Sequence, residues 1–190
     1  MYNASFYPTP PEVAEKMLAK AGKLSGRSIL EPSAGKGDLA DAAVGKLECY
    51  YHTRCRELVH CIEIEPELQA AIRGKGYPLV GTDFLTFWPD EKYDLILMNP
   101  PFANGDAHLL HAWEILDHGD IVCLLNEQTL LNPCTSNRKL LTTIIEEHGE
   151  VEHLGSCFAE DALRKTQVRV SMVHLRKKRE IGRASCRERG

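Results

Sequence analysis

The chain has 190 residues, of which 43% are hydrophobic and 26% are charged, and its formal net charge is −4. These values are typical of one globular domain with its own core, and they exclude a strongly basic protein that coats nucleic acid. The sequence contains no apolar run long enough to span a bilayer, and it does not begin with a signal-peptide pattern.

The first predicted element is a helix that runs from about Pro10 to Lys20. Thr9 is placed to cap its N-terminus, and consecutive prolines suit the first helical turn. Two aromatic residues, Phe6 and Tyr7, precede this helix. They are either a hydrophobic staple that fixes how the chain enters the helix, or a cover over a bound ligand.

A short apolar strand from Ser28 to Glu31 leads into a loop of small residues, and a helix follows from Asp38 to about Glu48. Small residues let a ligand approach the backbone closely, and glycine takes dihedral angles that other residues avoid. The loop has neither the G-x-G-x-x-G pattern of dinucleotide-binding proteins nor the lysine pattern of a P-loop. Glu31 is an acid at the place where a pyrophosphate would lie in a dinucleotide-binding loop, which favours a ligand without phosphates. Its carboxylate could contact the cationic end of such a ligand. The alternative is that the segment is an ordinary strand–helix turn. The candidate binding residues of this segment are Glu31, Pro32, Ser33, Ala34, Gly35, Gly37 and Asp38.

Two further strands end in acidic residues. After a predicted loop over 49–56, the second strand ends with Glu63, at the position from which an acid binds ribose hydroxyls in βαβ folds. Glu65 is expected to cap the next helix, over 66–74. The third strand is predicted to end at Asp83, whose carboxylate can accept from an amino group while the following aromatic residue packs on a planar ring. The candidate binding residues here are Glu63, Ile64, Asp83 and Phe84.

The segment around Asn99 suggests chemistry on an amino group. The apolar run Leu95–Met98 is predicted to be a buried strand that Pro100 and Pro101 terminate. Asn99 is then held at the carboxyl end of a buried strand, where ligands bind in open α/β sheets. Its side-chain oxygen and the Pro100 carbonyl offer two acceptors to an exocyclic amine, and Phe102 offers a flat face to a planar base. The alternative is a strand end whose asparagine caps the next helix.

The later elements are predicted from their periodicity. We expect a helix over 107–118, a buried strand over 120–125, a loop over 126–137, a helix over 138–148 and a strand over 151–155. The alternation over 168–175 predicts a half-exposed antiparallel strand. His108 and His111 are expected to be solvated or capping residues, because no third metal ligand is evident. The seven cysteines lack a C-x-x-C pair, which predicts no zinc site, no disulfide framework and a reducing, cytoplasmic setting.

Basic residues gather near the C-terminus. They form either a phosphate-contacting patch or a solvated edge strand and tail. Residues 181–190 have no apolar periodicity and resemble translated sequencing-adapter read-through, so we expect one domain over residues 1–180 and a non-native or disordered tail over 181–190. The basic residues are Arg164, Lys165, Arg169, Arg176, Lys177, Lys178 and Arg179.

In their order, these motifs resemble those of gamma-type adenine-specific DNA methyltransferases, which belong to the class I S-adenosylmethionine-dependent enzymes. The Phe-Tyr-Pro-Thr-Pro segment resembles their N-terminal cofactor motif, and Glu-Pro-Ser-Ala-Gly-Lys-Gly-Asp resembles the first motif of class I methyltransferases. Asn-Pro-Pro-Phe resembles the motif of enzymes that methylate base amines. The whole chain is similar to the small methyltransferase domains of phage and mobile-element proteins.

The resemblance implies an α/β, Rossmann-like fold with a doubly wound, seven-stranded, mostly parallel sheet and an antiparallel last strand. It implies S-adenosylmethionine as cofactor, no metal, and direct methyl transfer to the 6-amino nitrogen of a flipped adenine in DNA. It adds Tyr7, Thr9, Pro10 and Asn99 to the cofactor-binding residues. The catalytic segment that it implies is Asn99, Pro100, Pro101 and Phe102.

Other functions stay open at this point. The acceptor could be a guanine or adenine amine in RNA, the N4 amine of cytosine, or, less in keeping with Phe102, a protein glutamine. Outside enzymes, the chain could be an inactive cofactor-binding subunit or a module that only binds nucleic acid. The chain has no room for the target-recognition domain that such enzymes carry. Sequence specificity is therefore expected to be low, to come from a partner subunit, or to be lost with a truncated C-terminus.

Overall fold

The computed structural model describes residues 8–48, 52–157 and 168–179. Tyr7, Arg164, Lys165 and the segment 181–190 lie outside the described residues, so the expectations that concern them stay predictions. The domain boundary at residue 180 also stays a prediction. None of the described helices is both long and apolar enough to cross a membrane.

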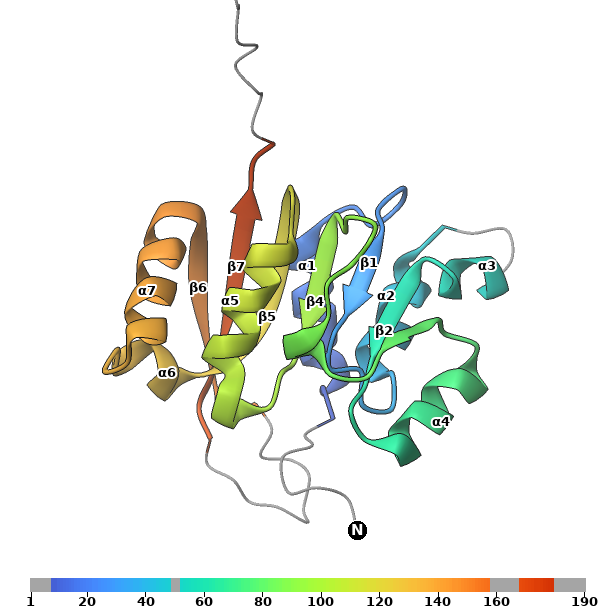
Figure 1. The fold of residues 1–190 in the computed structure, drawn as a ribbon, viewed down its shortest axis with the longest axis horizontal. Coiled ribbons are helices and arrows are strands. Elements are labelled where there is room, and N and C mark those ends of the chain that lie inside the picture. The colour runs from blue at the N-terminus through green and yellow to red at the C-terminus, as the bar shows by residue number, and fades with distance from the viewer. Residues whose placement is uncertain (1–7, 49–51, 158–167, 180–190) are drawn as a thin grey trace, which may run out of the picture.

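Seven strands form one sheet in the order β3-β2-β1-β4-β5-β7-β6 (Figure 1). Neighbouring strands from β3 to β5 are parallel, whereas β7 runs antiparallel to both β5 and β6. The predicted mostly parallel sheet with an antiparallel last strand is therefore confirmed. Strand order reverses between β1 and β4, the kind of switch point at which open α/β sheets bind ligands. The strands are β1 (Ile29–Glu31), β2 (Val59–Ile62), β3 (Leu79–Gly81), β4 (Leu95–Met98), β5 (Gly119–Asn126), β6 (Gly149–Gly155) and β7 (Val170–Lys177).

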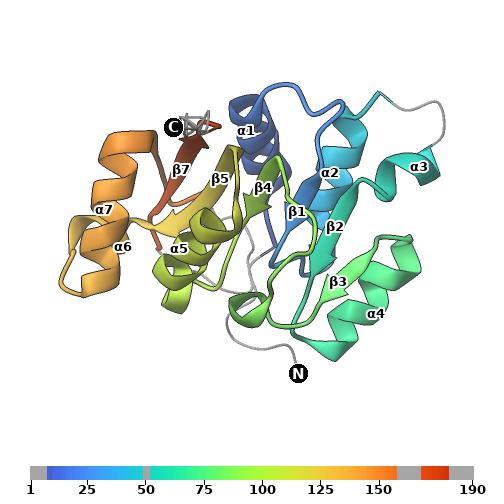
Figure 2. The ribbon, with the colours of Figure 1, turned by 45° about the horizontal axis from the view of Figure 1, so that its top comes forward.

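Helices cover both faces of the sheet, as the predicted doubly wound fold requires (Figure 2). Helices α1 and α2 pack together on one face, and α5 and α7 pack together on the other. The helices are α1 (Pro11–Ala21), α2 (Asp38–Lys46), α3 (His52–Arg56), α4 (Pro66–Lys75), α5 (Gly105–Ile115), α6 (Glu127–Leu131) and α7 (Ser136–His148), with short 3-10 helices η1 (Phe84–Thr86) and η2 (Phe102–Asn104).

Alternate residues of β4 divide the core into two layers. Leu95 and Leu97 belong to the cluster with α1 and α2, whereas Ile96 and Met98 belong to the cluster with α5 and α7. All four side chains are buried. A strand covered on both faces needs apolar residues at every position, which is why this segment is a continuous apolar run. The same arrangement holds Asn99 firmly at the end of the strand.

Several local predictions are wrong where packing overrides the local pattern. The segment predicted as a loop over 49–56 contains α3, and the loop predicted over 126–137 contains α6. Strand β7 is buried along most of its length rather than half-exposed, because β5 and β6 flank it and helices cover it. Cys55 is disulfide-bonded, which the sequence prediction of no disulfide framework did not foresee.

The end of the sheet away from the carboxyl ends of its parallel strands carries an ionic cluster around the buried Asp120. Asp120 at the start of β5 accepts hydrogen bonds from Arg27 (2.5 Å), Arg176 (2.8 Å) and His174 (2.9 Å). Burial works against ionisation of Asp120, but the three hydrogen bonds outweigh it and hold the pKa of this carboxyl below its usual range. Arg176, one of the basic residues for which both a phosphate-contacting patch and a solvated edge strand were considered, thus pairs with Asp120 within the fold.

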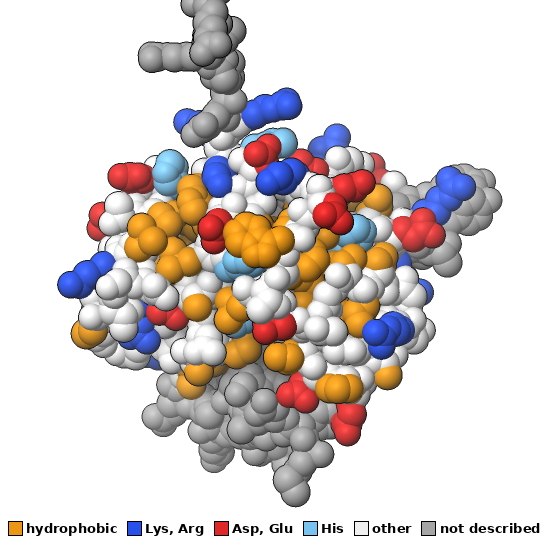
Figure 3. All heavy atoms as spheres, in the orientation of Figure 1, with side chains coloured by type: hydrophobic (Ala, Val, Ile, Leu, Met, Phe, Trp, Pro, Cys, Tyr) orange, Lys and Arg blue, Asp and Glu red, His pale blue; other side chains and the backbone are white. Residues whose placement is uncertain are grey.

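Two more of these basic residues are paired within the fold. Arg169 forms an ion pair with Glu127 at 2.6 Å, and Lys177 donates to two backbone carbonyls of the α5 region. Among the side chains described on the face shown in Figure 3, acidic and basic groups are interspersed around hydrophobic ones.

Candidate functional site

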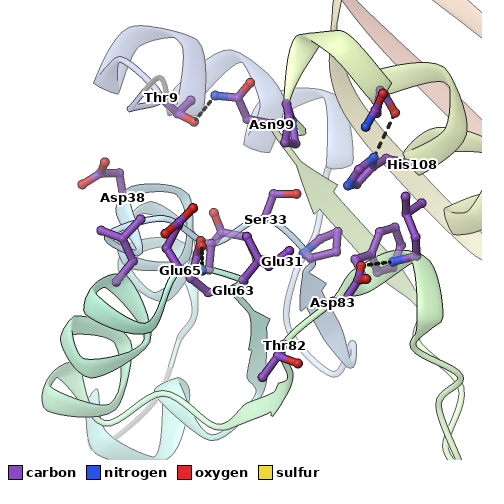
Figure 4. A pocket seen from close by; sticks show the side chains of 18 of the residues that line it. Thr9, Glu31, Ser33, Asp38, Glu63, Glu65, Thr82, Asp83, Asn99 and His108 are labelled. Atoms are coloured by element: carbon purple, nitrogen blue, oxygen red, sulfur yellow. Dashed lines mark hydrogen bonds between the residues drawn. The ribbon is translucent and has the colours of Figure 1, made fainter. Parts of the chain in front are cut away.

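A cavity of about 450 Å³ lies where the carboxyl ends of β1, β2 and β4 meet the segment after β3 (Figure 4). This edge is the one predicted from the polar residues that follow each strand. Most of the residues predicted for the site line the cavity, together with several that were not predicted. The predicted ones are Thr9, Glu31, Pro32, Ser33, Ala34, Asp38, Glu63, Ile64, Asp83, Phe84, Asn99 and Pro101.

The small-residue loop after β1 adopts the conformation that glycine permits. Gly35 and Gly37 have φ angles of 56° and 82°, in the left-handed region. A Cβ atom at Gly37 would also lie 3.0 Å from Cδ1 of Ile72. The Gly35 N–H donates to Oε2 of Glu63 at 2.6 Å, which ties the loop after β1 to the end of β2. Gly35 and Gly37 therefore shape the loop without lining the cavity.

Glu63 follows directly after the last residue of β2 and is 7% exposed. Its Oε1 accepts the backbone N–H of Glu65 at 2.8 Å, so each carboxylate oxygen receives one backbone hydrogen bond. Burial raises the pKa of Glu63, and these backbone hydrogen bonds oppose that effect. Because each carboxylate oxygen has two lone pairs, both oxygens can still accept a ligand hydroxyl. Glu65 stands at the N-cap of α4 as expected, but its side chain makes no capping hydrogen bond.

Glu31, the last residue of β1, carries a buried oxygen that lacks a hydrogen-bond partner. The residue is 3% exposed, and Oε2 has no partner among the described residues. Burial raises the pKa of Glu31 well above its usual range, and the charges of Asp38, Asp41 and Glu63 add to this effect. A cationic ligand group would satisfy the oxygen and favour the ionised carboxylate. The site therefore fits a ligand that carries an ammonium group and no phosphate.

Asp83 lies two residues beyond the end of β3, which is shorter than predicted. Its side chain caps η1, since Oδ1 accepts the N–H of Leu85 at 3.0 Å. Phe84 is 3% exposed and supplies an apolar wall. A carboxylate beside an aromatic ring suits a planar heterocycle with an amino group. Figure 4 shows Asp83 at the opposite side of the cavity from Asp38.

Asn99 lines the cavity from the end of β4, and its amide is tied to the segment before α1. Nδ2 donates to Oγ1 of Thr9 at 3.1 Å (Figure 4). The prediction that Thr9 caps α1 is wrong: Pro10 occupies the N-cap without a side-chain hydrogen bond, and the Thr9 hydroxyl serves Asn99 instead. The alternative in which Asn99 caps the next helix is also wrong, since Asn104 stands at the N-cap of α5.

Some predicted residues lie next to the cavity rather than on its wall. Pro10, Pro100 and Phe102 do not contribute to the lining of this cavity. Phe102 packs against the core cluster on the α1 and α2 face, together with Leu154 and Val168.

His108 was missed by the sequence prediction, which treated it and His111 as solvated or capping residues. Both are buried, at 9% and 8% exposed, and only His108 lines the cavity. The signal in the sequence is weak, because the histidines lie on a helix whose burial depends on packing against η1. The other lining residues not predicted are Pro8, Glu65, Leu68, Thr82, Leu85, Ala103 and Asn104. The described residues include no group of three or more His, Cys, Asp or Glu that could hold a metal.

Comparisons with known proteins point to one fold. No family model matches the chain. The type II methyltransferase M.CvrRI of Paramecium bursaria Chlorella virus XZ-6E is 26% identical over 118 residues, which are 61% of this chain and 29% of that protein. The chain thus spans less than a third of this curated relative.

Two solved structures extend the match over nearly the whole chain. The type I restriction-modification methyltransferase subunit of Streptococcus thermophilus has a TM-score of 0.71 and 19% identity, covering 94% of this chain and 46% of that one. A putative RNA methyltransferase of Pyrococcus horikoshii has a TM-score of 0.64 and 20% identity, covering 93% of this chain and 87% of that one. Together with the sheet order and the sequence match, these similarities identify the chain as having the class I S-adenosylmethionine-dependent methyltransferase fold, as its motifs predicted.

Proposed function

We propose that the chain binds S-adenosylmethionine and transfers its methyl group to the exocyclic amino group of adenine in DNA. The observation that carries this proposal is one cavity that brings together Glu31, Glu63 and Asp83 with Asn99. The three acids offer acceptors for a ligand with an ammonium group, ribose hydroxyls and an amino-substituted ring. Asn99 offers an amide at the edge of the same space.

The acidic residues are proposed to hold the cofactor along the carboxyl edge of the sheet. Glu31 accepts from the ammonium group, which supports the use of its unpartnered Oε2. Glu63 accepts from the ribose hydroxyls, and Asp83 accepts from the adenine amine while Phe84 packs on the ring. The left-handed conformation of Gly35 and Gly37 shapes the loop after β1, whose residues Pro32, Ser33 and Ala34 line the cavity.

Asn99 is proposed to position the acceptor amine. Oδ1 is the acceptor atom of the Asn99 amide, and the hydrogen bond from Nδ2 to Thr9 fixes the direction in which it points. The Pro100 carbonyl is the second acceptor, and Phe102 stacks on the extruded base. Two acceptors on one amino group hold its nitrogen lone pair in a fixed direction and raise its electron density.

The bound cofactor supplies an electrophilic methyl group on a sulfonium centre. The residues around Asn99 orient the amine for in-line approach, so most of the acceleration is expected to come from positioning. A methylated amine loses its extra proton readily, so no dedicated general base is needed. The base must leave the helical stack to reach the site.

The choice of adenine in DNA rests on the adenine-type order of the motifs, and the sequence relative, a type II methyltransferase, supports methyl transfer. The second candidate acceptor is a base amine in RNA, since the structural match to a putative RNA methyltransferase covers 87% of that protein. Because the chain spans 29% of the first relative and 46% of the type I subunit, we propose that target recognition comes from a partner subunit or further domain.

Calorimetry with S-adenosylhomocysteine and transfer of labelled methyl groups to DNA, RNA and protein pools test the proposal. We expect wild-type protein to bind the ligand and to label DNA on adenine. Asn99→Ala should abolish labelling and leave ligand affinity within about threefold, because the amide acts on the amine. Asn132→Ala, an exposed asparagine beyond α6, is the matched control and should keep full activity. Cofactor binding without labelling of any pool would contradict the enzyme and favour an inactive subunit.

A further inference from the structure

One buried imidazole at the Asp83 end of the cavity has no role in the reaction described above. His108 on α5 is 9% exposed and reaches into the cavity beside Asp83 (Figure 4). Its Nδ1 lies 2.9 Å from the backbone oxygen of Asn104, one turn earlier on the chain. A carbonyl oxygen only accepts, so Nδ1 must carry the proton of this hydrogen bond.

The tautomer set by Asn104 determines what His108 offers to a ligand. With the proton on Nδ1, a neutral imidazole presents Nε2 as a bare acceptor. Burial lowers the pKa of His108, while the Asn104 carbonyl and the Asp83 and Asp106 carboxylates oppose this effect, so the neutral ring is favoured. Nε2 makes no hydrogen bond to any of the described residues.

The ring is also held in one orientation. It lies against Phe84 with ring centroids 5.8 Å apart and an interplanar angle of 33°. Phe84 is in turn contacted edge-on by His111, at 4.9 Å. Packing on one side and the Asn104 bond on the other leave the imidazole little freedom, which is the condition for a selective hydrogen bond.

We propose that His108 determines the specificity of the cofactor site for adenine, with Nε2 accepting one N–H of the cofactor's 6-amino group and Asp83 accepting the other. This inference rests on the proposed function, since it concerns the same cofactor. An amino group has two N–H donors, and the two acceptors on this wall of the cavity match them. A 6-oxo purine carries an acceptor in place of the amine and would leave His108 and Asp83 facing an oxygen.

The test compares the binding of S-adenosylhomocysteine with that of its 6-oxo analogue, S-inosylhomocysteine, by calorimetry. Wild-type protein should prefer the adenosyl ligand by at least about 100-fold. His108→Asn keeps a donor near the position of Nδ1 but removes the acceptor at Nε2, and should reduce this preference about 5- to 10-fold. His108→Gln keeps an acceptor near the position of Nε2 and should retain the preference to within about threefold.

His111→Phe is the matched control, because His111 also touches Phe84 but donates to the Phe87 carbonyl outside the cavity. It should leave the ratio of the two affinities unchanged. An unchanged ratio in His108→Asn, or an equal loss of affinity for both ligands, would overturn the inference while leaving the proposed function standing. Failure of wild-type protein to bind S-adenosylhomocysteine at all would overturn the proposed function and this inference with it.

Discussion

Thr9 and Asn99 are joined by a hydrogen bond of 3.1 Å, although 90 residues separate them in the sequence. The bond links the segment before α1 to the end of β4, at the edge of the cavity. Thr9 is buried and lines the same cavity. The contact therefore connects the proposed catalytic amide to the N-terminal motif that is predicted to bind the cofactor.

Thr9→Val should slow methyl transfer about 5- to 10-fold, because the Asn99 amide loses the partner that orients it. Affinity for S-adenosylhomocysteine should fall by less than the rate, because valine keeps the shape of threonine on the cavity wall. Thr9→Ser keeps the hydroxyl and should restore the rate. Single-turnover rates together with calorimetry measure the two effects separately. A valine variant with wild-type rate would show that the contact does not orient the amide.

Glu31→Gln should stabilise the ligand-free protein by about 1 to 3 kcal/mol and weaken S-adenosylhomocysteine binding about 10- to 100-fold. The wild-type carboxylate is buried with an unpartnered oxygen, which costs free energy until a cation binds. Thermal unfolding measures the expected gain in stability, and calorimetry measures the expected loss of ligand affinity. The exposed Glu67→Gln on α4 is the control and should leave both values unchanged. Stabilisation without loss of affinity would argue against Glu31 as the ammonium partner.

Cofactor affinity should fall as the pH is lowered. Burial raises the folded-state pKa of both Glu31 and Glu63, and the ionised carboxylates are the forms that accept from the ligand. Protonation therefore removes acceptors as the pH falls through these raised pKa values, above the range in which exposed carboxyls titrate. In the ligand-free protein the sign is opposite: a raised carboxyl pKa gives stability that is present at low pH and lost as the pH rises. Calorimetry at several pH values should show that ligand affinity depends less on pH in Glu31→Gln than in the wild-type protein.

Gly37→Ala should destabilise the protein by about 1 to 2 kcal/mol. Its φ of 82° is unfavourable for any residue with a Cβ, and the added atom would lie 3.0 Å from Ile72. Gly45, inside α2, is the contrasting glycine, because a Cβ added there would meet no described atom outside its own helix within 4 Å. Gly45→Ala should therefore stabilise the helix by up to about 1 kcal/mol. Equal effects at both positions in chemical denaturation would contradict the conformational argument.

Asp120→Asn should destabilise the fold by about 3 to 5 kcal/mol at neutral pH, since it leaves Arg27 and Arg176 without their buried partner. The hydrogen bonds hold the pKa of Asp120 low against the opposing effect of burial, so its contribution is present at neutral pH and lost as the pH falls through that low pKa. Denaturation at several pH values should show the wild-type and variant stabilities converging in acid. Ligand stoichiometry should stay at the wild-type value, because the cluster is at the other end of the sheet.

Local patterns in the sequence predicted which strands end in residues that line the cavity. Leu95–Met98 is apolar at every position and is followed by an asparagine and two prolines, so both the buried strand and its end are encoded within about ten residues. The same holds for Glu31 before the glycine loop and for Glu63 at the end of β2. Strand order could be expected only through the family resemblance, because no local pattern states which strands are neighbours.

Tertiary packing decided what distant residues do to one another. The residues around Thr9 do not predict that it bonds to Asn99. The residues around His108 do not predict that α5 buries this side chain beside Asp83. The packing of Phe102 against a core cluster is also not visible in the local sequence, because the residues of that cluster come from other elements of the fold. The sequence by itself determined the chemical groups at the edge of the sheet, because strand ends follow from short-range patterns of burial and chain termination. Only the folded chain decided how those groups are oriented and paired, because orientation depends on contacts between segments far apart in the sequence.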